Sequence, residues 1–83
     1  MRRQVRSTQD LGSAIRELRR KKDLTQHELA KRARVSQKWI SHVESGKTRL
    51  GLDSLLALLD ALDMNLILQS REATELDLDQ LLG

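Results

Sequence analysis

Apolar residues recur at helical spacing near the beginning of the chain. The repeat has intervals of four and then three residues and consists of Leu11, Ile15 and Leu18. Such a repeat places one apolar stripe on a helix. Ser7 or Thr8 can cap its start through a side-chain oxygen, and the basic run at 19–22 suits its last turn, where the helix dipole favours positive charge. The pattern predicts a helix that ends near Lys22.

Two shorter helices are predicted next by the residues that start and stop them. Thr25 and Glu28 have the spacing of a capping box, in which each side chain accepts a hydrogen bond from the other residue's backbone N–H. Ser36 can cap the following helix, and Ser45-Gly46 supplies its stop. The inward-facing residues of that third helix are predicted to be Ile40 and Val43.

The second half of the chain changes from helical spacing to alternation. A broad apolar stripe predicts a fourth helix and consists of Leu52, Leu55, Leu56, Leu59 and Leu62. Over residues 64–70 the period becomes two, which predicts one short β-strand. Thr74 can cap a weak last helix among the acids and leucines of 71–83. We therefore divide the chain into a flexible basic arm (1–7), a helical domain (8–63), a strand (64–70) and an acidic, leucine-containing tail (71–83).

Length and composition narrow the protein class. A chain of 83 residues forms one small domain with little room for a sizeable catalytic cleft. It has 17 leucines, no proline, no cysteine and one aromatic residue, Trp39, which indicates a leucine-cored helical protein. The lack of cysteine excludes a disulfide scaffold, a Cys-ligated zinc site and a thiol nucleophile, and it fits a reducing cytoplasm.

Membrane insertion and export are not expected. No run of 18 or more apolar residues occurs, and the basic residues 1–6 lead into a polar stretch rather than an apolar signal core. We expect a cytoplasmic protein without a membrane partner.

Charge is divided unevenly between the two parts of the chain. Residues 1–49 contain 14 Lys/Arg and 5 Asp/Glu, a net charge of +9. Residues 50–83 contain one Arg and 7 Asp/Glu, a net charge of −6. A basic N-terminal part and an acidic C-terminal part suggest two different partners, and the partner of the basic part would be a polyanion. The alternative is ordinary solvated surface charge.

The second and third helices together have the organisation of a helix-turn-helix, whose second helix lies in the major groove of DNA. If Ile40 and Val43 face inward, the helical period places Lys38, Ser41 and His42 on the outer face and Gln37 at its edge. Gln pairs well with adenine, and Lys donates to the acceptors of guanine. The outer face is therefore equipped to read bases.

The sequence around these helices resembles the XRE/Cro-type helix-turn-helix family over residues 11–62. The matching segments are Leu18 to Glu28 (LRRKKDLTQHE), Leu29-Ala30, Val35-Ser36, Ile40-Ser41 and Val43 to Lys47. The resemblance implies an all-α, compact domain of four to five helices with the lambda-repressor-like arrangement. To this the alternation adds one C-terminal β-strand that pairs across a homodimer.

The resemblance also implies roles for individual residues. The base-reading positions of the family fall on Ser36, Gln37, Lys38, Ser41 and His42. The positions that contact the DNA backbone in the family fall on Gln26, and on Lys47 and Arg49 in the loop after the third helix. Thr25, which caps the second helix beside Gln26, belongs to the same backbone-contacting set. A buried pair that ties the first helix to the end of the third is implied for Arg19 and Glu44.

Trp39 departs from the common family pattern, which has a small or medium polar residue there. On the helical wheel it lies at the flank of the core direction, so it is either a partly buried packing residue or a DNA-backbone contact through its indole N–H. His27 and His42 have no neighbouring Cys or paired His, so we expect no metal and no cofactor. Nothing around the exposed carboxylates would prepare them for acid–base catalysis.

A lone strand predicts a homodimer, because its backbone donors and acceptors need a partner chain. The simplest arrangement is a two-fold antiparallel ribbon with Ile67 near the axis. Its residues would be Met64, Asn65, Leu66, Ile67, Leu68 and Gln69. The alternative is an unpaired coil. Such a dimer would bind double-stranded DNA at an inverted-repeat operator with half-sites about 34–36 Å apart.

A strand that follows the last helix in so short a chain resembles the HipB-like antitoxins. This narrower resemblance implies a repressor that silences its own operon and binds a HipA-like kinase toxin. The tail at 71–83 combines a net charge of −3 with four leucines, so we expect it to contribute to toxin binding. The alternatives are a stand-alone regulator without a toxin, a protein-interaction module that has lost DNA binding, and a tail that merely frays or folds back on its own domain.

Overall fold

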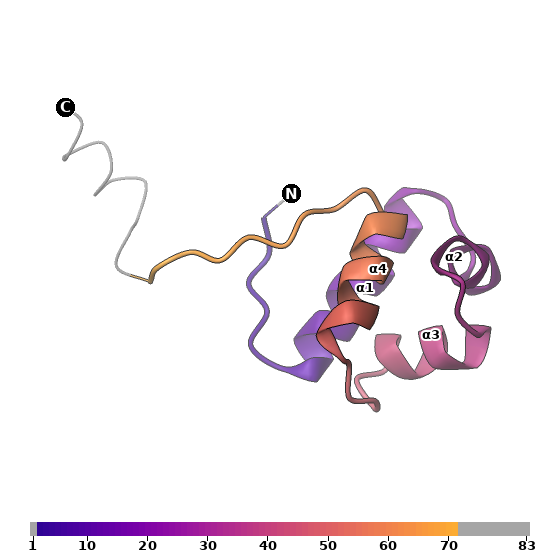
Figure 1. Ribbon diagram of the computed structural model, residues 1–83, viewed down its shortest axis with the longest axis horizontal. Coiled ribbons are helices and arrows are strands. Elements are labelled where there is room, and N and C mark those ends of the chain that lie inside the picture. Colours follow the sequence, from indigo (N-terminus) through magenta and orange to yellow (C-terminus); the bar gives the residue numbers. More distant parts are fainter. Residues whose placement is uncertain (1, 72–83) are drawn as a thin grey trace.

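The computed structural model describes residues 2–71, and within them the chain is all-α (Figure 1). Its helices are α1 (Thr8–Lys21), α2 (Gln26–Ala33), α3 (Gln37–Glu44) and α4 (Leu52–Ala61). The four predicted helices are confirmed. The weak last helix predicted from Thr74, like the acidic tail beyond residue 71, lies outside the described residues.

The first three helices start where their capping residues predict. Ser7 caps α1, because its Oγ accepts a hydrogen bond from the backbone N–H of Asp10 at 3.0 Å. The capping box of Thr25 and Glu28 is present at the start of α2 with both hydrogen bonds at 3.0 Å. The Oγ of Ser36 accepts from the N–H of Trp39 at 3.0 Å and caps α3. These local signals therefore fix where each helix begins.

The core lies between α3 and its neighbours. α3 packs against α1 and α2, and α2 packs against α4. The buried cluster contains Ile15, Leu18, Leu24, Leu29, Ala30, Ile40, Val43, Leu58, Leu59 and Leu62. Both residues predicted to face inward from the third helix belong to this cluster.

The predicted apolar face of the fourth helix was wrong in part. Leu58, absent from the predicted stripe, is fully buried, whereas Leu52 and Leu56 are 63% and 44% exposed. The helix turns its Leu58 and Leu59 toward α2 and the core, and no other part of the described chain covers Leu52 and Leu56 at the edge of the leucine face. The predicted stripe thus combines core residues with an uncovered apolar edge.

Gly12 allows α1 and α3 to approach each other closely. A Cβ at this position would lie 2.4 Å from the backbone oxygen of Val43 and 2.7 Å from that of Glu44. Gly12 is buried inside α1, where glycine lowers helix propensity. Glycine is suited to this position despite its low helix propensity, because only a residue without a side chain fits between the two helix backbones. An isolated glycine within a helical pattern is the sequence signal for such contacts.

Replacing Gly12 by alanine is expected to lower the free energy of unfolding by about 1–3 kcal/mol. The gain in helix propensity is outweighed, because the new methyl group must push α3 and its backbone away from α1. Urea denaturation of the two proteins measures the difference. Ser13→Ala, at the exposed neighbouring position, is the control and should change stability by less than about 0.5 kcal/mol. A Gly12→Ala variant as stable as the control would contradict this packing.

The strand predicted at residues 64–70 is absent from the single chain. They have no regular secondary structure and run away from the end of α4 (Figure 1). A β-ladder needs a second strand, and residues 2–71 of one chain contain none. Pairing with a second copy is untested by this structure and stays a prediction.

The basic arm has several contacts with the rest of the chain. Arg3 forms an ion pair with Glu17 of α1, and the backbone N–H of Arg6 donates to Asp10. Arg2 donates to Gln69 Oε1 at 3.1 Å, which joins the arm to the segment after α4. The arm therefore lies beside residues that the alternating pattern assigned to the dimer interface.

Candidate nucleic-acid interface

α3 has one buried face and one exposed face. Its inner residues, Ile40 and Val43, are almost completely buried. The side chains on the other side, and the capping residue before the helix, are exposed: Ser36, Gln37, Lys38, Ser41 and His42. These are the five positions predicted to read bases, so the fold leaves all of them accessible together on one helix. Their contact with bases stays a prediction.

A tight turn sets α3 at an angle to α2. Only residues 34–36 separate the two helices. Arg34 adopts a left-handed conformation with φ of 59°, and the N–H of Val35 donates to the carbonyl of Ala30 at 3.0 Å. Arg34 is also exposed, and it adds a cation directly before the exposed face of α3. Neither the helical period nor the family resemblance indicates Arg34 as a DNA-contacting residue.

The loop after α3 places two further cations near the end of that helix. Lys47 and Arg49 are exposed, as expected for contacts with a phosphate backbone. The backbone N–H of Lys47 donates to the carbonyl of His42 at 3.0 Å, and Gly46 before it has a φ of 73°. Thr8 Oγ1 donates to the carbonyl of Gly46 at 3.2 Å, which ties this loop to the start of α1.

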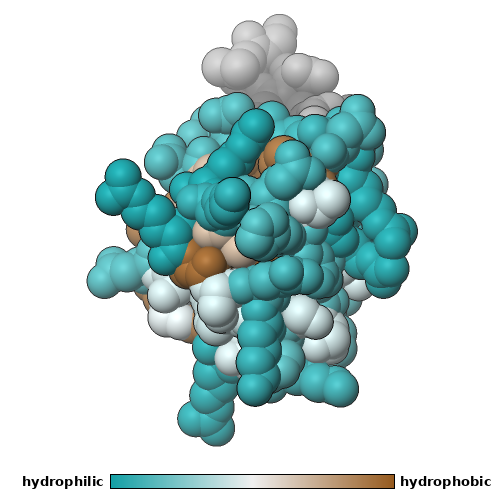
Figure 2. All heavy atoms as spheres, turned by 90° about the vertical axis from the view of Figure 1, so that its right-hand side faces the viewer, coloured by the Kyte–Doolittle hydropathy of each residue, from teal (hydrophilic) through white to brown (hydrophobic). Residues whose placement is uncertain are grey.

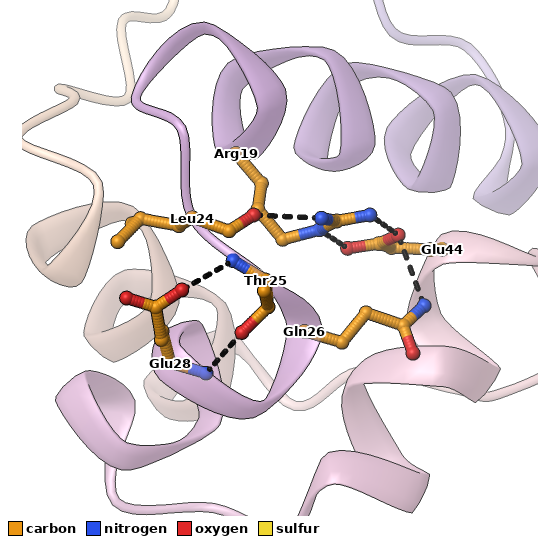
Figure 3. A network of polar contacts seen from close by, with 6 residues as sticks. All are labelled: Arg19, Leu24, Thr25, Gln26, Glu28 and Glu44. Atoms are coloured by element: carbon orange, nitrogen blue, oxygen red, sulfur yellow. Dashed lines mark hydrogen bonds and ion pairs between the residues drawn. The ribbon is translucent and has the colours of Figure 1, made fainter.

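Arg19 and Glu44 join α1 to the end of α3 (Figure 3). Arg19 Nε lies 2.6 Å from Glu44 Oε2, and Arg19 Nη2 lies 2.9 Å from Glu44 Oε1, so the pair is bidentate. The side chains are 10% and 4% exposed, respectively. Arg19 Nη1 also donates to the carbonyl of Leu24 at 2.8 Å. The hydrogen bonds that Arg19 donates to Glu44 raise the pKa of Arg19 above its ordinary value, so this guanidinium keeps its charge.

Gln26 stands at the first position of α2 and belongs to the same network. Its Nε2 donates to Glu44 Oε1 at 3.2 Å, and its side chain is half-buried (Figure 3). The family resemblance implies a phosphate contact for Gln26 but does not indicate its contact with Glu44. The two residues lie 18 positions apart, and no local pattern connects them.

The N-terminus of α2 leaves two backbone N–H groups available for an anion. The backbone N–H of Thr25 donates to Glu28 Oε1, and this hydrogen bond is the main reason that the pKa of Glu28 is lowered. Since the capping box uses the N–H groups of residues 25 and 28, the N–H groups of residues 26 and 27 remain directed along the helix axis, where a helix N-terminus binds phosphate.

Trp39 is half-buried and packs against the core cluster. This position supports the packing interpretation of the residue. A contact of its indole N–H with the DNA backbone stays a prediction.

The surface around these helices is charged and polar. The face over α2 and the adjoining end of α3 is largely hydrophilic, with a small apolar area (Figure 2). Among residues 2–71, no group of His, Asp and Glu side chains has the arrangement that holds a metal ion. In the same part of the chain, no helix has the length and apolar character needed to cross a membrane.

Comparison with known proteins assigns these features to a family. The family described as helix-turn-helix domain matches residues 10–71, which include α1 from Asp10 onward and the whole of α2, α3 and α4. No curated protein is detectably similar to the chain in sequence.

Several solved structures are similar to the chain. The clp gene regulator ClgR from C. glutamicum is 33% identical with a TM-score of 0.67, over 69% of this chain and 73% of ClgR. The restriction-modification controller protein C.AhdI from Aeromonas hydrophila is also 33% identical, with a TM-score of 0.68 over 70% of this chain and 88% of that protein. HipB in its complex with the O2 20mer is 25% identical, with a TM-score of 0.76 over 86% of this chain and 99% of HipB.

Proposed function

Because the chain belongs to the helix-turn-helix family of DNA-binding transcriptional regulators, which are not enzymes, we propose that it is a dimeric repressor that also serves as an antitoxin. In this proposal α3 reads an inverted-repeat operator and the protein silences its own operon. Its second partner is a HipA-like kinase toxin, which the repressor holds inactive.

The single observation that supports DNA reading most strongly is the division of α3 into two faces. One face is locked into the core by Ile40 and Val43, and the other presents Gln37 and Lys38 to solvent. A reading helix needs this rigidity, because base contacts depend on side chains held at fixed positions in the major groove. The cations at Lys47 and Arg49 flank the face and suit phosphate contacts.

A second copy of the chain is the proposed partner for the exposed apolar residues. Leu52 and Leu56 on α4 and residues 66–68 after it are exposed, although such residues are usually covered. The segment at 64–70 has no strand beside it in the described part of the chain, and an antiparallel copy would supply one. A dimer through these residues would present two reading helices.

The extent of the similarity to HipB supports the antitoxin part of the proposal. HipB in the HipA-HipB-O2-O3 complex is 26% identical over 84% of this chain and 99% of HipB, with a TM-score of 0.74. ClgR and C.AhdI have a higher sequence identity with this chain than HipB has, but the similarity of each extends over about 70% of the chain. These two regulators support the alternative proposal, in which the chain is a regulator without a toxin.

Binding to DNA is expected to weaken steeply with salt. If each subunit neutralises about 3–5 phosphates, a plot of log affinity against log salt concentration for the dimer should have a slope of about −5 to −9. Fluorescence anisotropy with a labelled duplex at several salt concentrations measures this slope. A slope near zero would contradict a DNA-binding function.

Co-purification from the native host tests the antitoxin part. A kinase-like protein should be retained by the full chain, and removal of residues 72–83 should weaken its capture while leaving operator affinity nearly unchanged. Failure to retain such a protein, together with normal operator binding, would favour the regulator without a toxin. Equal capture by the full and shortened chains would place the toxin surface on the helical domain.

A further inference from the structure

We propose that Glu44 is a positioning residue for DNA binding, which orients the side-chain amide of Gln26 toward a phosphate of the DNA backbone. The proposal rests on the proposed DNA-binding function and adds a second role for the Arg19–Glu44 pair. The observation that carries it is the hydrogen bond of 3.2 Å from Gln26 Nε2 to Glu44 Oε1, at the first residue of α2.

The carboxylate determines which end of the amide faces it. An ionised carboxylate only accepts hydrogen bonds, whereas the amide of Gln26 has a donating Nε2 and an accepting Oε1. The Nε2 end must therefore turn toward Glu44. The second hydrogen of Nε2 is left for another acceptor, and a phosphate oxygen at the start of α2 is an acceptor of the right kind.

Without this acceptor the amide has two nearly equivalent orientations. The last torsion of a glutamine side chain is broad and roughly two-fold, so the amide readily turns by half a revolution. In the turned state its carbonyl oxygen would face the phosphate, and two acceptors would then oppose each other. Glu44 thus removes the orientation that disfavours DNA, and it does so before the DNA arrives.

Arg19 makes it possible for a carboxylate to hold this place. Glu44 is 4% exposed on its side chain and accepts two hydrogen bonds from Arg19 at 2.6 and 2.9 Å. The guanidinium compensates the negative charge, which would otherwise repel the phosphate. In the described part of the chain every buried side-chain nitrogen and oxygen has a hydrogen-bond partner, so the network is complete without DNA.

The experiment compares four variants with the unchanged protein on a random-sequence duplex of about 20 base pairs, long enough for two half-sites. Gln26→Ala removes the proposed phosphate contact, Glu44→Asp withdraws the carboxylate from Gln26, and the double variant combines both. Ile15→Val is the matched control, because it lowers stability from the core side of α1 without touching Arg19, Glu44 or Gln26. All affinities are measured at a temperature at which circular dichroism shows each variant to be folded.

Gln26→Ala is expected to weaken binding about 5- to 150-fold, the range for losing one net hydrogen bond in each subunit. Glu44→Asp should weaken binding by a similar factor, and the double variant should be no weaker than Gln26→Ala within about two-fold. Ile15→Val should stay within about two-fold of the unchanged protein. The slope of affinity against salt should not change with Gln26→Ala or Glu44→Asp, since the neutral amide releases no counterion.

A second readout follows the amide itself. The chemical-shift difference between the two Nε2 protons of Gln26 should be larger in the unchanged protein than in a free glutamine amide, and it should fall toward the free value in Glu44→Asp but not in Ile15→Val. Equal losses of affinity in Glu44→Asp and Ile15→Val would overturn the proposal and leave Glu44 as a scaffold residue. Independent losses from Gln26→Ala and Glu44→Asp would also overturn it. The proposed function fails separately, if the unchanged protein binds neither this duplex nor any other.

Discussion

Replacing Arg19 by alanine is expected to lower the free energy of unfolding by about 3–5 kcal/mol, the range for removing one member of a buried ion pair. Stability is lost because Glu44, the ion-pair partner of Arg19, would keep a buried negative charge without its bidentate donor. The carbonyl of Leu24 would lose its hydrogen bond as well. For a domain of this size such a loss is a large part of the total stability. Chemical denaturation followed by circular dichroism measures it.

Two further variants distinguish the effect of breaking the ion pair on stability from the general effect of losing an arginine. Arg16→Ala removes an exposed cation from the same helix and should change stability by less than about 0.5 kcal/mol. Arg19→Met combined with Glu44→Leu removes both charges and should recover part of the loss, because an apolar pair leaves no uncompensated charge. A loss below about 1 kcal/mol for Arg19→Ala would show that the pair contributes little to the fold.

Ile67→Asp is expected to convert the dimer to a monomer and to reduce operator affinity by about 1,000-fold or more, toward the level of non-specific binding. Ile67 is 78% exposed in the single chain and lies near the proposed two-fold axis. Two aspartates would then face each other across the ribbon, where opposed like charges destabilise strand pairs. Sedimentation velocity measures the oligomeric state, and anisotropy measures the affinity.

The control for this variant adds the same charge elsewhere. Ser13→Asp places a carboxylate on the exposed side of α1, so it should leave the protein dimeric. If Ile67→Asp also stays dimeric, the ribbon is not the interface. Dissociation by Leu56→Asp instead would then move the interface to the exposed leucines of α4.

The sequence predicts the helices well because their signals are local. Ser7, Thr25 and Ser36 each act on N–H groups two or three residues away, so their roles can be read without knowing the fold. The inward positions of α3 follow from helical periodicity for the same reason.

Other features depend on packing and could not be derived from such patterns. The buried face of α4 was partly mispredicted, because its leucines form an arc wider than the core contact and only the neighbouring helices decide which of them are covered. The close approach at Gly12 depends on where α3 lies. The hydrogen bond between Gln26 and Glu44 joins two helices, and no spacing in the chain indicates it. The resemblance assigned each of these two residues a separate role, and the structure adds their connection.

If the exposed face of α3 reads DNA sequence, the bases it prefers should depend on Gln37 and Lys38. Selection of bound duplexes from a random library, first by the unchanged protein and then by Gln37→Ala and Lys38→Ala, measures this dependence. The unchanged protein is expected to enrich an inverted repeat. Each variant should lose preference at one position of each half-site, with a cost of about 1–3 kcal/mol on the selected site and little change on random DNA. Enrichment of no common sequence, or equal losses on selected and random DNA, would show that this face does not read DNA sequence.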